Sequence, residues 1–363
     1  MPDFSHEYYV PLLRGKMGEF IALKELSLTA RSSLTPLLEV PDRDWDYEVE
    51  DYRKTVEEHI NRYPDLITDN WGLAEIFVDA PSVSETDVMN DGTHPLEYIF
   101  DRLSLASSLA IPVTSLSRPA TYQQAVQSIV ARNGRGVCIR IERDALSSAT
   151  FATDLQALLG YLNISEGEVD LVLDLGFIGG DSQIPIFQSF ATNFIATNSI
   201  ALNARTLTLL SSAFPVNLSN FGIGISSTPR SDWHLWQNII ANSQLPRLPS
   251  FGDYAISNPE IAQIDPRLMR MSASIRYTSD DVWFIFKGYG ITNAARGGTS
   301  QYFDLARAIT QHRSWCGRTF SWGDAFIDDV ANNVAGPGNG QSWRQAPTNH
   351  HLHFAVNQIA NLP

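Results

Sequence analysis

The chain has 363 residues, of which 44% are apolar, and a formal net charge of −14. This composition supports a sizeable buried core and excludes a disordered chain. The acidic balance works against binding to nucleic acid and to anionic membranes. No apolar run reaches the ~18 residues of a membrane span, the N-terminus lacks the pattern of a signal peptide, and two cysteines, Cys138 and Cys316, indicate no disulfide framework. We therefore expect a cytoplasmic protein, and no pattern predicts a cofactor.

Short apolar runs alternate with stretches of helical periodicity along most of the chain. Helices are predicted around Phe20 and Leu23, over residues 96–109, from Pro119 to Gly134, around Leu155 and Leu162, and over 184–196 and 232–241. Another helix is predicted from Tyr52 to Tyr63, ending at Pro64, while residues 216–230 read as a long loop. The predicted strands are residues 8–13, 34–40, 73–80, 111–116, 136–141, 169–175, 206–210 and 249–256.

Eight strands that alternate with helices predict a parallel sheet with right-handed crossovers. At this chain length we favour a closed (β/α)₈ barrel of the TIM type over residues 1–315, with an open doubly wound sheet as the alternative. Beyond the eighth strand, residues 273–277 and 282–286 predict a hairpin, and residues 301–312 a helix. Residues 316–363 form a predicted C-terminal extension that packs on the barrel.

Charged residues occupy one face of several predicted strands. In residues 137–142, Val137, Ile139 and Ile141 share one face, while Arg140 and Glu142 share the other. The apolar face of a barrel strand meets the helices, so the charged face is expected to look inward, toward the mouth where barrel sites are built. The predicted ligand-binding residues are Arg14, Lys16, Glu39, Asp79, Arg140, Glu142, Asp174 and Asp253.

This set of charges has two interpretations that the sequence leaves open. Buried charges must be paired, so the residues could form a structural network of ion pairs. They could equally form a binding or catalytic site, in which Glu39, Asp79 and Asp174 could hold Mg²⁺. The histidines of residues 350–353 do not follow a zinc signature, and packing of the tail is the favoured interpretation for them.

Two blocks near the N-terminus carry a resemblance to a known family. Residues 9–16 (YVPLLRGK), followed by Gly18 and Glu19, and residues 35–39 (TPLLE) resemble the opening of the beta protein family. Residues 250–254 (SFGDY), residues 275–277 (IRY) and Trp283 resemble later blocks. Members occur in phages and many bacteria, so the resemblance implies a phage or phage–host setting such as defence or counter-defence. It supplies no catalytic residues.

Two functions from different classes are consistent with these features. The first is a binding protein, whose charged barrel mouth takes a polar small molecule or a protein partner. The second is a metal-assisted hydrolase of a phosphorylated or nucleotide-like small molecule, in which Arg14, Lys16 and Arg140 would neutralise phosphate. No known catalytic motif is present in the sequence, which favours the first.

Overall fold

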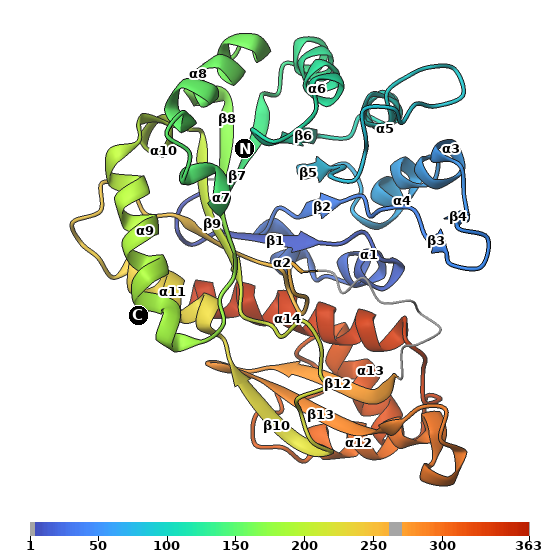
Figure 1. Cartoon of the computed structure of the whole chain (residues 1–363). Coiled ribbons are helices and arrows are strands. Elements are labelled where there is room, and N and C mark those ends of the chain that lie inside the picture. Colours follow the sequence, from blue (N-terminus) through green and yellow to red (C-terminus); the bar gives the residue numbers. More distant parts are fainter. Residues whose placement is uncertain (1–3, 261–270, 363) are drawn as a thin grey trace.

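The computed structural model describes residues 4–260 and 271–362, and in this part of the chain eight parallel strands close into one barrel (Figure 1). The order around the barrel is β1-β2-β5-β6-β7-β8-β9-β11, and β11 pairs with β1 to close it. The strands are β1 (Tyr9–Leu13), β2 (Leu37–Glu39), β5 (Ile76–Asp79), β6 (Ala110–Thr114), β7 (Val137–Glu142), β8 (Val169–Phe177), β9 (Thr206–Ser212) and β11 (Ser250–Asp253). The predicted closed barrel is confirmed, and the open sheet is excluded.

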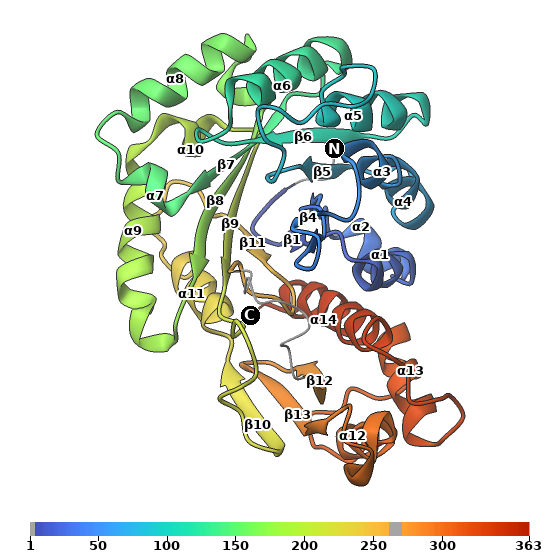
Figure 2. The same ribbon diagram turned by 45° about the vertical axis from the view of Figure 1, so that its right-hand side comes forward.

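Helices cover the outside of the barrel (Figure 2). They are α1 (Met17–Lys24), α2 (Leu28–Ser32), α3 (Val56–Ile60), α4 (Tyr63–Asn70), α5 (Pro95–Leu105), α6 (Ala120–Asn133), α7 (Arg143–Leu146), α8 (Phe151–Leu162), α9 (Ile184–Thr197), α10 (Ser199–Asn203) and α11 (Ser231–Ile240). Local chemistry sets several ends: α6 begins after Pro119 and ends at Gly134, which adopts the left-handed conformation (φ 62°) that glycine tolerates.

The strand faces separate two cores. Val137, Ile139 and Ile141 pack outward with the helices in the larger core. Cys138 and Val172 point inward, where a smaller apolar cluster fills the middle of the barrel. In β7 and β8, as predicted, the apolar side chains of one face meet the helices. The inward positions near the carboxyl ends are the charged Arg140 and Asp174.

A second layer lies against one side of the barrel (Figure 1). Strands β10 (Gly224–Pro229), β13 (Val282–Gly290) and β12 (Ser272–Thr278) form an antiparallel sheet in that order. One face of this sheet packs on helices α12 (Gln301–Thr310) and α13 (Trp322–Ala331). The predicted hairpin is confirmed as β12 and β13, and the domain boundary at residue 315 stays a prediction.

The last helix, α14 (Ser342–Ala360), lies between the barrel and this second layer (Figure 1). Its residues Leu352, Ala355, Val356 and Ile359 belong to the same core as the barrel strands. Helix α14 also packs on α1, where a Cβ atom on Gly18 would lie 2.9 Å from the carbonyl oxygen of Gln341. The helix that covers the β1–β11 seam is thus supplied by the end of the chain.

Four local predictions need correction. Pro64 does not end a helix but lies in the first turn of α4, where its missing N–H is tolerated. Tyr52 lies in a short hairpin of β3 (Trp45–Asp46) and β4 (Asp51–Tyr52), and helix α3 begins only at Val56. Part of the predicted loop 216–230 forms strand β10, and the helix predicted over 96–109 ends at Leu105.

Candidate functional site

Arg140 is the centre of a buried charge network at the C-terminal end of the barrel. It projects inward from β7, and its Nε atom donates to Asp174 Oδ2 on β8 at 2.8 Å. The Nη1 atom lies 2.6 Å from Glu39 Oε1 and 3.6 Å from Asp79 Oδ2, and Nη2 donates to the Tyr254 hydroxyl at 2.8 Å. The predicted inward contact between Arg140 and Asp174 is confirmed.

Each carboxylate of this network has a further partner. Glu39 accepts from Arg14 Nη1 at 2.6 Å, and Asp174 accepts from the Tyr254 hydroxyl at 2.6 Å. Asp79 accepts from Arg118 Nη2 at 2.7 Å and from the Tyr122 hydroxyl at 3.1 Å. A fully paired set of buried charges is what a low-dielectric interior requires.

Burial dominates the protonation equilibrium at Asp79. Desolvation raises the pKa of this carboxyl above its usual value, and the cations Arg118 and Arg140 oppose the shift. Burial also raises the pKa of Tyr254 well above its usual value, with Asp174 adding to the effect. Tyr254 is therefore a neutral hydroxyl at physiological pH that can donate one hydrogen bond and accept another.

A cavity of ≈ 260 Å³ opens above this network. Its floor is formed by Arg140, Asp174 and Tyr254, and its rim by Glu142, Arg143 and Asp144. A neighbouring hollow of ≈ 450 Å³ shares Arg143, Gly176 and Pro259 with it. Within the described residues, Arg143 makes one ion pair, a 3.9 Å contact with the exposed Asp144. The rim charges are therefore open to solvent, in contrast to the floor.

The predicted site residues fall into three groups. Arg14, Glu39, Asp79, Arg140 and Asp174 form one network, and Glu142 lines the cavity above it. Lys16 is exposed at the N-cap of α1 and does not join the network within the described residues. Asp253 projects from the other face of β11, away from the mouth.

Asp253 points outward because its strand neighbour Phe251 packs in the helix-facing core, and the two residues share a face. The next residue, Tyr254, takes the inward place that was predicted for Asp253. The alternation of strand faces, counted from the apolar Phe251, predicts the inward position for Tyr254. Arg118 and Tyr122 carried no such signal, because they reach Asp79 from outside the strands.

The histidines near the C-terminus tie α14 to both layers. His351 Nε2 lies 2.8 Å from Asp253 Oδ2, and its Nδ1 lies 2.9 Å from the Thr278 hydroxyl on β12. His350 Nδ1 lies 2.9 Å from Asp324 Oδ2 on α13. Burial lowers the pKa of His351 below its usual value and so favours the neutral ring, although the carboxylate of Asp253 opposes this shift. These contacts match the predicted packing role of the tail.

No group of three or more His, Cys, Asp or Glu side chains arranged to hold a metal ion occurs within residues 4–260 and 271–362. The three carboxylates considered for Mg²⁺ surround the guanidinium of Arg140, which takes the central place that a cation would occupy. The geometry therefore favours Arg140, rather than a metal ion, as the cation among these carboxylates.

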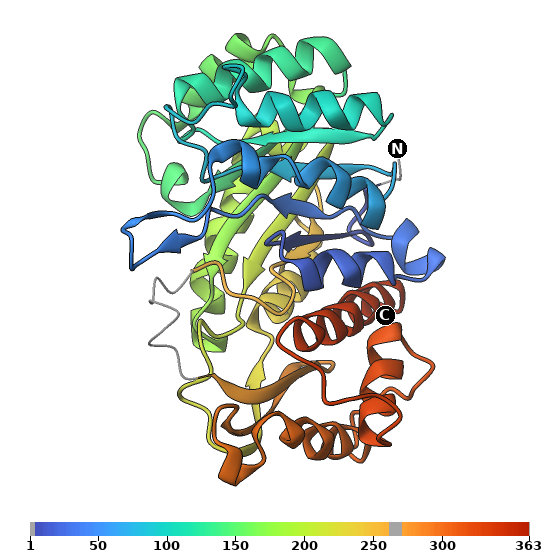
Figure 3. The same ribbon diagram turned by 90° about the vertical axis from the view of Figure 1, so that its right-hand side faces the viewer.

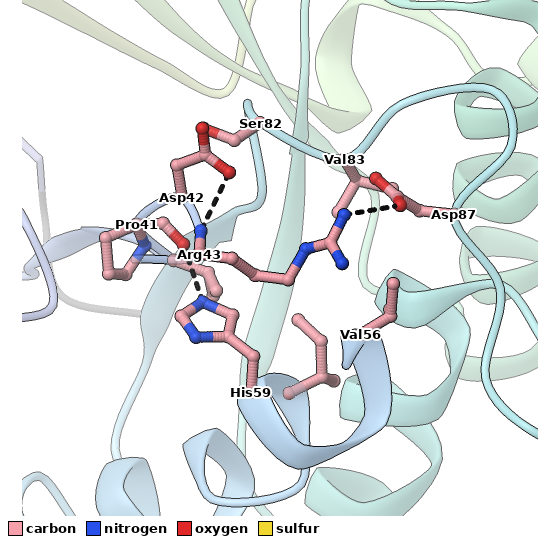
Figure 4. Close-up of a pocket in the computed structure, with 10 residues that line it drawn as sticks. Pro41, Asp42, Arg43, Val56, His59, Ser82, Val83 and Asp87 are labelled. Atoms are coloured by element: carbon pink, nitrogen blue, oxygen red, sulfur yellow. Dashed lines mark hydrogen bonds and ion pairs between the residues drawn. The ribbon is translucent and has the colours of Figure 1, made fainter. Parts of the chain in front are cut away.

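A small hollow lies beside the mouth, at the end of β2 (Figure 4). Its volume is ≈ 20 Å³, room for about one water molecule. Within it, His59 Nε2 lies 2.8 Å from the Pro41 carbonyl oxygen, and Arg43 Nη2 donates to Asp87 Oδ1 at 3.2 Å. Burial lowers the pKa of His59 below its usual value, so the neutral ring can donate to that carbonyl. These bonds fix the chain where it leaves the barrel.

Comparison with known proteins identifies the family of this chain. No helix of the described chain is both long and apolar enough to span a membrane. No curated protein matches the sequence. The sequence profile described as Beta protein matches residues 9–357, which include both N-terminal blocks that suggested the resemblance. The match spans nearly the whole chain, and the chain therefore belongs to the Beta protein family.

Proposed function

We propose that this chain is a binding protein that takes a small polar ligand at the mouth of its barrel. The observation that carries the proposal is the contrast between floor and rim. The floor charges, centred on Arg140, satisfy one another, whereas Glu142, Arg143 and Asp144 face an open cavity. Ligand sites commonly sit at this face of the barrel and combine a rigid floor with a few polar groups that fix orientation.

The rim chemistry indicates what such a ligand would carry. Arg143 would pair with an anionic group, since guanidinium matches the geometry of carboxylate and phosphate. Glu142 and Asp144 would accept hydrogen bonds from hydroxyl or amino groups. The neighbouring hollow of ≈ 450 Å³ extends the space beyond Arg143, so a molecule of amino-acid to nucleotide size would be accommodated.

The proposal is tested by thermal shift of the full chain with amino acids, nucleotides and sugar phosphates. A ligand at 100 times its Kd stabilises the native state by about 2.7 kcal/mol. At about 2.1 cal/mol/K per residue, this raises the Tm of a chain of 363 residues by about 3–4 °C. Arg143→Ala should abolish the shift, whereas Arg132→Ala, of similar side-chain exposure (49% against 52%), should keep it.

A shift that survives both Arg143→Ala and Glu142→Gln would refute a site at this rim. The hydrolase alternative predicts a shift with Mg²⁺ or Mn²⁺ alone. We expect none, because Arg14, Arg118 and Arg140 together balance the charge of the three inner carboxylates.

The biological setting that we propose, in phage infection or in the conflict between phage and host, rests on the family alone. Plaque counts on a susceptible bacterium, with and without the expressed chain, test it. If mouth binding matters in this setting, Arg143→Ala should remove any change in plaque number that the wild-type chain causes.

A further inference from the structure

A short acidic hairpin stands out from the barrel beside the mouth (Figure 3). Residues 42–53, here named the acidic hairpin, comprise β3, β4 and their connection, and follow the carboxyl end of β2. They hold six carboxylates and two arginines, so that a net charge of −4 out of the −14 of the whole chain lies in this one segment. The segment contributes no residue to the cavity at the mouth.

Large apolar side chains are exposed along the acidic hairpin. Trp45 and Tyr47 are each 40% exposed, Tyr52 is 36% exposed and Val49 is 69% exposed. Single exposed apolar residues are ordinary, but a contiguous group framed by charge is typical of an interaction surface. The rings of Trp45 and Tyr52 lie 5.0 Å apart in a T-shaped pair, which fixes their orientation.

One ring of the hairpin already holds a guanidinium group. Arg43 Cζ lies 3.8 Å from the centroid of the Tyr52 ring, and the same guanidinium donates to Asp87 at 3.2 Å. An aromatic face combined with a carboxylate is thus the local mode of arginine binding. The base of the hairpin is fixed by the contact of His59 with the Pro41 carbonyl oxygen (Figure 4) and by a bond from Arg53 N to the Asp44 carbonyl oxygen at 2.9 Å.

We propose that the acidic hairpin is the docking surface for an arginine-rich segment of a partner protein. Arginine side chains would stack on the faces of Trp45 and Tyr47 and pair with Asp44, Glu50 and Asp51, much as Arg43 combines the Tyr52 ring with Asp87 within the chain. The net charge of −4 distinguishes an arginine-rich partner from the other candidates. The hairpin repels nucleic acid and anionic lipid, and it repels a second copy of the chain, because two surfaces of charge −4 would meet. This inference is independent of the proposed ligand at the mouth.

The test measures fluorescence anisotropy of a labelled oligo-arginine peptide with the full chain at low and moderate salt. We expect Trp45→Ala combined with Tyr47→Ala to weaken binding about tenfold. Tyr161→Ala, which removes another exposed ring far along the chain on α8, should leave binding unchanged. An oligo-lysine peptide should bind more weakly than oligo-arginine, because ammonium groups do not stack on rings as guanidinium groups do.

A matched pair of charge variants separates the hairpin from the overall acidity. Asp44→Asn with Glu50→Gln should weaken binding and flatten its salt dependence. Glu7→Gln with Asp69→Asn makes the same change of net charge at two exposed residues elsewhere and should have little effect. Circular dichroism melting confirms that each variant is folded.

Three results would overturn the proposal. Equal losses from the two charge pairs would mean that only net charge attracts the peptide. Unchanged binding by the variant with Trp45→Ala and Tyr47→Ala would show that these rings do not bind arginine. A self-association in sedimentation that disappears with Trp45→Ala and Tyr47→Ala would assign the surface to a second copy of the chain.

Discussion

Replacing Arg140 with methionine removes the cation at the centre of the barrel while keeping most of its side-chain volume. Arg140 is 6% exposed, and its carboxylate neighbours Glu39, Asp79 and Asp174 are 3%, 0% and 3% exposed. Loss of one partner of a buried pair typically costs about 3–5 kcal/mol, because a buried charge is left behind. Here Arg14, Arg118 and Tyr254 remain as second partners. We therefore expect about 3 kcal/mol, the lower end of that range.

The loss should appear as a lower Tm and should depend on pH. At about 2.1 cal/mol/K per residue, 3 kcal/mol corresponds to a Tm lowered by about 4 °C for 363 residues. Burial already raises the pKa of Asp79, and without Arg140, one of the cations that oppose this shift, it would rise further. Protonation of Asp79 would then stabilise the fold, so the deficit should shrink as pH falls from 8 to 5. The assay is calorimetric melting of Arg140→Met and wild type across this range.

Arg143→Met at the exposed rim is the control and should change stability by no more than about 0.5 kcal/mol. Adding Asp174→Asn to Arg140→Met should recover part of the loss, because residues of one network are not additive. A deficit of Arg140→Met below about 0.5 kcal/mol, or one that does not vary with pH, would show that water rather than protein satisfies these charges.

Three further predictions concern the tail and Asp232, a buried carboxyl on helix α11. A chain ending at Arg313 lacks α13 and α14 and should be insoluble or melt earlier than the full chain, since the barrel seam loses its cover; equal melting would make the tail an appendage. Burial raises the pKa of Asp232 to about 7, above its unfolded value, so its contribution to stability should be lost as pH rises through 7. Asp232→Asn should therefore gain Tm relative to wild type between pH 5 and pH 8, and parallel curves would contradict this. His351→Ala removes one hydrogen-bond partner of the buried Asp253, which keeps the Tyr9 hydroxyl and the Ala255 N–H, and should cost about 1–3 kcal/mol. His353→Ala, which is not paired with a carboxylate in the described structure, should cost less in urea unfolding.

Features set by neighbouring residues in the sequence, such as the face on which a strand residue lies, could be predicted from the sequence. The alternation of Val137, Ile139 and Ile141 was enough to place Arg140 inward, because three branched apolar residues need the helix side. The inward prediction for Asp253 was wrong, because Asp253 shares its face with Phe251, which packs in the helix-facing core. Strand β10 was not predicted, because its side chains are exposed or half-buried and its partner β13 lies more than fifty residues away.

Contacts between residues far apart in the sequence could not be predicted from a short stretch of it. Arg118 reaches Asp79 from the loop after β6, and nothing near Arg118 indicates that partner. Helix α14 carries weak periodicity because the barrel, α13 and the sheet contact it on different sides, so that polar residues such as Asn349 and His350 are buried along with its apolar ones. A helix buried on several sides loses the single apolar stripe on which sequence prediction relies.

The closing of the barrel at its seam sets an order on biosynthesis. Strand β1 is made first, yet it pairs with β11 at residues 251–253 and is covered by α14, the last helix of the chain. At synthesis rates of about 5–20 residues per second, an emerging β1 waits roughly 20–70 s for the helix that covers it. Until β11 emerges, the nascent chain presents an unclosed sheet with two free edges, and until α14 emerges the seam lacks its covering helix. Translation that stops before β11 therefore leaves the barrel open, and translation that stops before α14 leaves its seam uncovered.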